Sequence, residues 1–166
     1  MPNRVDVRYP INTLISYHYF KKNDIADIAS NGYRLIGDSG AFSAMTTGKP
    51  IELDAFGESA RKWHNDLAWV ASLDVIGDQE ATWNNFLRLR VDYGVDVIPT
   101  IHYGSSPSEI DKYVEMGVDY IGLGGMVPLK SEPQRLMRWT LSMFKYARDN
   151  YPQRSEEHTS ELQSRE

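Results

Sequence analysis

Residues 69–102, WVASLDVIGDQEATWNNFLRLRVDYGVDVIPTIH, decide the fold class, because they follow the order strand, helix, strand. The apolar run 69–75 predicts a buried strand. The apolar residues of 79–93 recur at three- and four-residue spacing, which predicts a helix that Gly94 ends. The run 95–102 predicts the next strand. Strands that alternate with helices in this way are typical of a parallel sheet with helices packed outside it.

The same strand–helix unit recurs on both sides of this stretch. Ser106-Pro107-Ser108-Glu109 predicts a further helix start, because it is a capping box with proline at the first helical position. The remaining apolar periodicity predicts strands at 14–19, 33–37 and 120–124, and helices at 24–30, 54–68 and from Glu132-Pro133 to about Asn150.

Five successive units leave a choice between a doubly wound sheet and an eight-unit barrel. A doubly wound fold carries a glycine-rich phosphate turn after its first strand, whereas the first predicted strand here ends in Tyr17-His18-Tyr19-Phe20, with no glycine. A full barrel needs about 250 residues. We therefore expect an α/β fold, a truncated (β/α)8 TIM barrel with about five units. Its two unpaired edges predict that the chain is unstable alone or pairs with another chain, such as a second copy in a homodimer.

Composition narrows the class of protein. The chain has 166 residues, the length of one domain, and its 41% hydrophobic and 25% charged residues predict a folded core. It has no apolar run of about 18 residues, so we expect no membrane span. The absence of cysteine excludes disulfides and a thiol nucleophile in this chain and favours a cytoplasmic location. The net charge of −5 indicates no broad basic face for nucleic acid.

The C-terminal residues 154–166, RSEEHTSELQSRE, resemble the translation of a DNA-sequencing adapter. The codons AGA TCG GAA GAG CAC give Arg-Ser-Glu-Glu-His, and the adapter continues in the same frame; the alternative is a natural polar tail. Segments of foreign origin are left out of fold reasoning. We therefore expect 1–153 to be the N-terminal part of the domain, 154–166 to be a non-native tail, and the natural reading frame to continue beyond Gln153.

Polar groups and glycines gather where the predicted strands end. Barrels place active sites at the C-terminal ends of their strands, and these ends carry His18, Asp38, Asp74, His102 and the glycines of 122–125. Asp74 lies inside an apolar run, where a carboxylate is costly unless it is hydrogen-bonded or binds a ligand, so a functional role is favoured there.

The other strand ends also have structural interpretations. Asp38-Ser39-Gly40 can be a turn with Phe42 covering the core. His102 can equally be a structural histidine or a ligand contact. The glycines of 122–125 can form a tight loop before a helix, or they can let backbone amides approach a flat ligand closely.

Three motifs in order resemble the tRNA-guanine (queuine) transglycosylase superfamily. They are Asp38-Ser39-Gly40-Ala41-Phe42-Ser43, the later Asp74, and Gly124-Gly125-Met126. The segment 73–78, with Ile98-Pro99 and His102, looks closer to divergent phage or bacterial members, which include DNA 7-deazaguanine transglycosylases. The resemblance implies a base-exchange glycosyltransferase that replaces guanine in tRNA or DNA with a 7-deazaguanine base.

The resemblance implies a role for each residue of the first two motifs. Asp38 would be the catalytic general acid/base or would hold the base, and Ser39 would contact the base beside it. Phe42 would stack on the base. Asp74 would accept hydrogen bonds from the ring and exocyclic N–H groups, which suits a guanine-like edge.

The third motif would supply further contacts to the base. Backbone amides near Gly124 and Gly125 would donate to its carbonyl oxygen, and Met126 would line the pocket. His102 would take the place of a family glutamine that also reads the base.

The chain also departs from the family pattern. Ala41 and Ser43 stand where the family usually has glycine and glutamine. The family's nucleophile, a second aspartate, and its zinc ligands, three cysteines and a histidine, would lie beyond Gln153. We therefore expect residues 1–153 to hold no metal or cofactor and to show no turnover.

Two other classes of protein fit the same residues. His18, Asp38, Asp74 and His102 could form a divalent-metal site of a barrel hydrolase or isomerase. The chain could also belong to a non-catalytic protein that keeps the base pocket and lacks the nucleophile.

Overall fold

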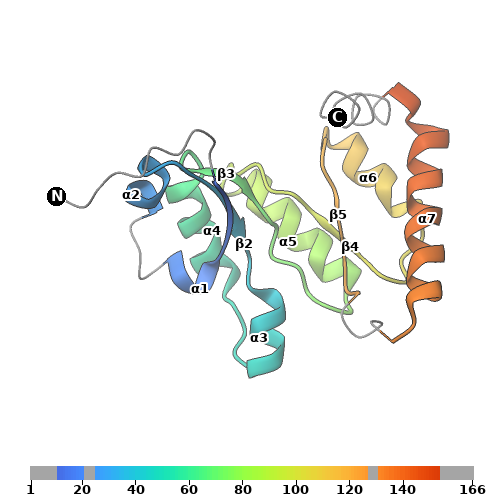
Figure 1. Ribbon diagram of the computed structural model, residues 1–166, viewed down its shortest axis with the longest axis horizontal. Helices are drawn as coiled ribbons and strands as arrows, with labels where there is room; N and C mark the ends of the chain where they lie inside the picture. Colours follow the sequence, from blue (N-terminus) through green and yellow to red (C-terminus); the bar gives the residue numbers. More distant parts are fainter. Residues whose placement is uncertain (1–10, 21–24, 127–130, 154–166) are drawn as a thin grey trace. The chain divides into compact units, whose positions relative to one another are not determined.

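The computed structural model describes residues 11–20, 25–126 and 131–153 (Figure 1). The segment 154–166, interpreted above as adapter-derived, lies outside the described residues. The chain divides into two compact units, Met1–Thr100 and Ile101–Glu166.

The structure is a mixed α/β fold with two small parallel sheets, so the prediction of a truncated TIM barrel is wrong. The three-stranded sheet has the order β1 (Ile11–Ser16), β2 (Tyr33–Asp38) and β3 (Leu67–Val70). The other sheet pairs β4 (Thr100–His102) with β5 (Gly122–Gly124).

The described strands do not form one continuous sheet, because they are short and their pairing is interrupted. A single bridge, from Ala71 to Ile98, joins the segment after β3 to the segment before β4. β4 begins only after Pro99, which has no N–H to donate to a ladder. The alternation of strands and helices was therefore predicted correctly, whereas the described strands do not form the single barrel sheet that was expected.

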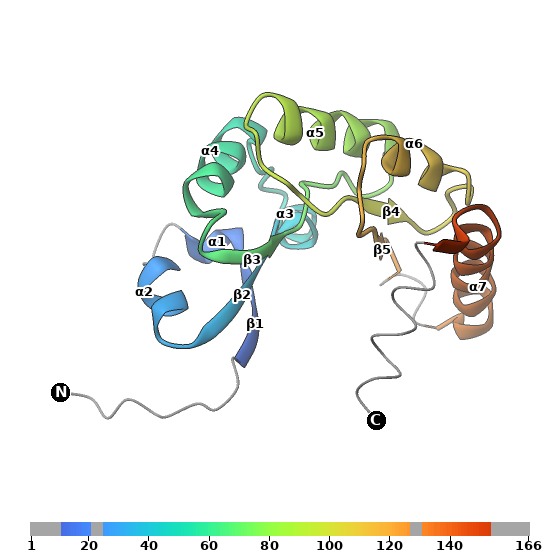
Figure 2. The same cartoon turned by 90° about the horizontal axis from the view of Figure 1, so that it is seen from above.

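The first unit contains five helices among its described residues. They are α1 (Tyr17–Phe20), α2 (Ile25–Ser30), α3 (Ala41–Thr47), α4 (Leu53–Trp63) and α5 (Gln79–Val91). Figures 1 and 2 show α2 and α4 on one side of the three-stranded sheet. On that side Leu35 and Val70 of the sheet are buried, as are Phe56 and Ala60 of α4.

The sheet has a second, more exposed face. Leu14 is 67% exposed and Trp69 is 40% exposed, and both belong to the row of register partners that includes Ile36. Because side chains alternate along a strand, Ser16 and Asp38 follow this same face at the carboxyl ends of β1 and β2. The fold thus brings polar groups to an accessible edge of the first sheet.

The second unit contains α6 (Glu109–Glu115) and α7 (Pro133–Asn150). Ile110 and Tyr113 of α6 are buried together with Met143 of α7. The predicted start of α7 at Glu132-Pro133 is confirmed, since Glu132 is the N-cap residue and Pro133 is the first helical residue.

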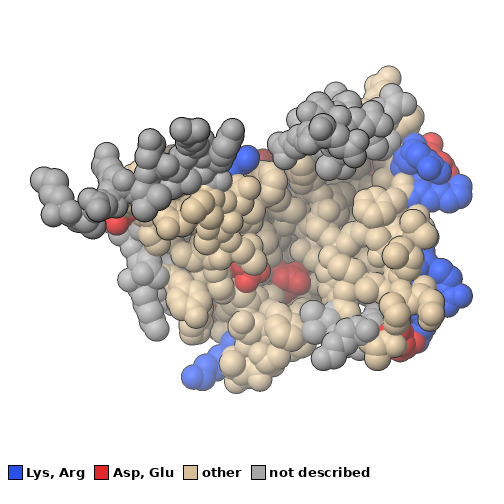
Figure 3. All heavy atoms as spheres, in the orientation of Figure 1, with Lys and Arg blue, Asp and Glu red and all other residues tan. Residues whose placement is uncertain are grey.

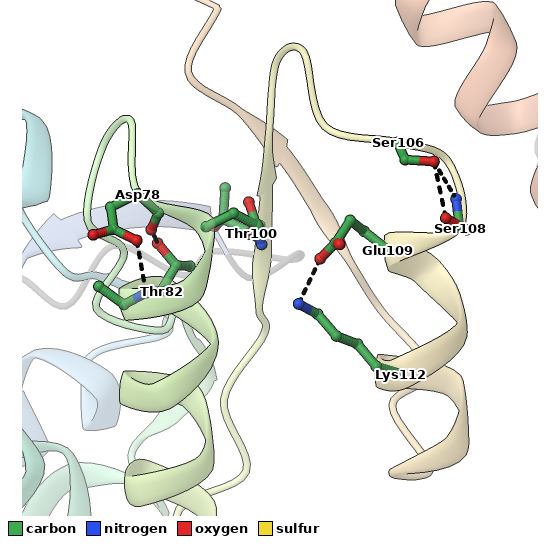
Figure 4. A network of polar contacts seen from close by, with 9 residues as sticks. Asp78, Thr82, Thr100, Ser106, Ser108, Glu109 and Lys112 are labelled. Atoms are coloured by element: carbon green, nitrogen blue, oxygen red, sulfur yellow. Dashed lines mark hydrogen bonds and ion pairs between the residues drawn. The ribbon is translucent and has the colours of Figure 1, made fainter.

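The predicted capping box is not formed at α6. The hydroxyl of Ser106 accepts a hydrogen bond from the N–H of Ser108, at 3.3 Å, and the helix begins only at Glu109. Figure 4 shows the carboxylate of Glu109 paired with Lys112 along the helix instead of reaching back to Ser106. The ion pair at i,i+3 has replaced the expected cap.

No helix among the described residues is long and apolar enough to cross a bilayer.

Candidate functional site

The carboxyl end of β2 and the segment after β3 bring Asp38, Ser39 and Asp74 together. The hydroxyl of Ser39, a residue only 2% exposed, donates to Oδ1 of Asp74 at 3.4 Å and accepts from the N–H of Ala41 at the same distance. One serine therefore links the turn after β2 to the second carboxylate. In Figure 3, acidic side chains lie side by side among uncharged atoms where β2 ends in Figure 1.

The turn itself is built by Gly40. Its φ of 78° lies in the left-handed region, which glycine enters without the steric penalty of a side chain. In this conformation its N–H donates to Oδ2 of Asp38 at 3.1 Å. The turn thus fixes the carboxylate of Asp38 at the edge of the sheet.

The electrostatics of the turn favour the neutral form of Asp38. Partial burial is the main cause that raises the pKa of this carboxyl group; the N–H of Gly40 opposes the rise, and the charge of Asp74 adds to it. When two carboxyl groups lie this close, the charge of one makes it easier for the other to keep a proton. Such a pair is suited to general acid–base chemistry, in which a carboxyl group accepts or donates a proton.

Phe42 follows the turn on α3, a helix that is absent from the elements predicted from the sequence. Phe42 is 46% exposed, so the alternative in which it covers the core is wrong. Glycines in the left-handed conformation flank the helix at both ends, Gly40 before it and Gly48 after it. This pair of glycines is a signal in the sequence from which α3 could have been predicted.

Ser16 is a residue that sequence reasoning missed. It ends β1, it is the register partner of Asp38, and its Oγ is buried without a hydrogen-bond partner in the structure. A Cβ on Gly40 would lie 3.0 Å from this oxygen, so glycine leaves room for the hydroxyl. The sequence analysis placed the strand end at residue 19, and the bulky aromatic residues obscured the earlier end.

His18 is not at a strand end, contrary to the prediction. It lies in α1, the short helix that follows β1, and it is exposed. The strand ends earlier than predicted, at Ser16, because residues 17–20 form that helix. Its ring contacts the neighbouring ring of Tyr19, with 6.5 Å between centroids.

In the second unit the structure brings His102 together with the glycine loop. His102 ends β4 and is 5% exposed. The carbonyl of Gly124 accepts from the N–H of Tyr103 at 2.9 Å, which pairs the two strands. A Cβ on Gly125 would lie 3.3 Å from the Cβ of His102, so this glycine allows a close approach of the loop. Met126, the last residue of the motif, is half-buried.

Within residues 11–20, 25–126 and 131–153, no three histidine, aspartate or glutamate side chains gather closely enough to hold a metal ion. The set of His18, Asp38, Asp74 and His102 is therefore not assembled as a metal centre. Comparison with known proteins adds no further constraint: no protein-family profile, curated protein or solved structure matches this chain.

Proposed function

We propose that this chain binds a guanine-like base as part of a base-exchange glycosyltransferase that acts on tRNA or DNA. The observation that carries the proposal is the convergence of Asp38 and Asp74 at one edge of a parallel sheet: the two carboxyl groups influence each other's charge, and the buried hydroxyl of Ser39, the residue after Asp38, donates to Asp74. The three motifs described above support the choice of substrate class. The proposal does not depend on a closed barrel.

The chemistry of the pair fits such a base. A guanine or 7-deazaguanine ring offers N–H donors on one edge, and the carboxylate of Asp74, oriented by Ser39, can accept from them. The raised pKa of Asp38, caused mainly by burial, makes its carboxylate a stronger base than that of an ordinary aspartate. Phe42, exposed on α3 after the same turn, offers a ring on which the base can stack.

The remaining parts of the proposal come from the motifs alone. The roles of His102, Gly124, Gly125 and Met126 as base contacts stay predictions. The partners are tRNA or DNA and a free 7-deazaguanine base, in a cytoplasmic location. We assign no nucleophile to this chain, so the proposal predicts base binding without exchange.

Isothermal titration of the full chain with 7-deazaguanine tests the proposal, with adenine as the comparison ligand. Asp74→Asn removes one charge-assisted contact worth about 1.5–3 kcal/mol, so we expect roughly 10- to 150-fold weaker binding. Asp96→Asn is the matched control, because the side chain of Asp96 is 90% exposed and lies outside the cluster. Equal affinity of wild type and Asp74→Asn, or no affinity in the wild type, would contradict the proposal.

A further inference from the structure

The hydroxyl of Ser16 is a buried polar group that the fold leaves unsatisfied. Its Oγ has no hydrogen-bond partner among the residues that the structure describes. Buried hydroxyls are costly without a partner, so each one that persists calls for an explanation, and a functional role is one of these.

The position of Ser16 ties this hydroxyl to the Asp38 turn. Ser16 and Asp38 are register partners on adjacent parallel strands, so their side chains leave the same face of the sheet, about 4.8 Å apart along the ladder. The oxygen also lies 3.0 Å from the place that a Cβ on Gly40 would occupy. Ser16 therefore borders the same turn that fixes the carboxylate of Asp38.

A second serine with an unpartnered buried hydroxyl, Ser72, lies on the opposite face of the sheet and serves as a comparison. Ser72 is fully buried, and its Oγ also has no partner in the described structure. By the alternation of side chains, Ser72 follows the face of Val70, which α4 covers, whereas Ser16 follows the face of Leu14, which is 67% exposed. Ser16 is itself only half-buried, so rotation about its Cα–Cβ bond can turn the hydroxyl toward a ligand.

We propose that Ser16 is a further base-contacting residue of this site, whose hydroxyl forms its hydrogen bond with a polar atom of the bound base. The inference rests on the proposed function and deepens it by adding a contact that none of the motifs contains. A hydroxyl both donates and accepts, so it can match either a ring N–H or a carbonyl oxygen of the base. Gly40 is required beside it, because a side chain there would fill the space of the hydroxyl.

The test compares wild type, Ser16→Ala and Ser72→Ala in the full chain, by titration with 7-deazaguanine and by thermal unfolding without it. We expect Ser16→Ala to bind about 10-fold more weakly while its unliganded melting temperature is equal to or above that of wild type. Ser72→Ala should keep the wild-type affinity. Ser16→Cys, which is somewhat larger but retains a weak donor, should bind with intermediate affinity.

The two readouts separate the possible failures. Unchanged affinity in Ser16→Ala, with binding in the wild type, would overturn this inference and leave the proposed function intact. A fall of both affinity and unliganded melting temperature in Ser16→Ala would assign the hydroxyl a structural role and also overturn it. Absence of binding in the wild type would overturn the proposed function together with this inference.

Discussion

Asp38 in the first unit and Asp111 in the second are both half-buried carboxylates, but their surroundings differ. Both oxygens of Asp111 accept tyrosine hydroxyls at 2.7 Å, one from Tyr146 and one from Tyr151. Asp38 accepts the N–H of Gly40 and faces the negative charge of Asp74. A carboxylate with neutral donors on both oxygens fastens α6 to the end of α7. A carboxylate held against a like charge is suited to bind and exchange protons.

The largest effect is expected from a substitution in the buried core of the first unit, which supports the Asp38 site. Phe56 is fully buried on α4 and packs edge-to-face on Tyr17, with 5.2 Å between ring centroids. Phe56→Ala deletes a buried ring, so we expect the free energy of unfolding to fall by about 3–5 kcal/mol in urea titrations. Phe144→Ala is the control, because Phe144 is 64% exposed, and it should change stability by less than about 0.5 kcal/mol. Similar losses in both variants would contradict the assigned core.

The structural role of Asp111 can be tested at alkaline pH, through the tyrosine Tyr151 that donates a hydrogen bond to it. The hydrogen bond to Asp111 is the main cause that raises the pKa of Tyr151 to about 12, from an ordinary 10.0. A raised pKa means that the folded state favours the protonated hydroxyl, so this stabilisation is complete below pH 10 and is lost as pH rises toward 12. Tyr151→Phe should remove that part of the pH dependence in urea titrations at pH 9–12. Tyr33→Phe, at an exposed position, serves as the control. If the stability of Tyr151→Phe and of wild type depended on alkaline pH in the same way, the structural role of the hydrogen bond between Tyr151 and Asp111 would be contradicted.

Asp38 should respond at the acid end of the scale. Its raised pKa means that the folded state favours the protonated carboxyl group, mainly because of burial. The stabilisation is therefore present below the ordinary value of 3.8 and is lost as pH rises through the folded-state pKa. Asp38→Asn cannot ionise and can still accept from Gly40, so it should be more stable than wild type at pH 7 in thermal unfolding. Asp38→Ala, which lacks the acceptor, should not share this gain; a less stable Asp38→Asn would refute the assignment.

The elements of the fold were largely predictable from local patterns. Pro133 and Asn150 bound α7 as expected, because a proline-started amphipathic helix is a strong local signal. The prediction of a barrel was wrong, because the way in which strands join into sheets depends on contacts between residues far apart in the sequence. β3 was placed two residues too late and extended to residue 75, because the apolar run continues past Val70 after regular pairing has ended.

The candidate site was partly predictable, because two of its residues stand out in the local sequence pattern. Asp38 and Asp74 were found because a carboxylate in or after an apolar strand is unusual, and the rule that parallel strands end at one edge brought them together. Ser16 was missed because serine is unremarkable in a strand, and only the register with Asp38 and the unpaired buried oxygen distinguish it.

Titration of the Asp38 carboxyl carbon by NMR, in wild type and in Asp74→Asn, tests most directly whether the two aspartates share one site. The account predicts an Asp38 pKa above 3.8 in the wild type, and a lower value, still above 3.8, in Asp74→Asn, because a neighbouring negative charge is removed while burial remains. Asp111→Asn should leave the Asp38 titration unchanged. An Asp38 pKa that is ordinary, or that does not respond to Asp74→Asn, would contradict the central claim.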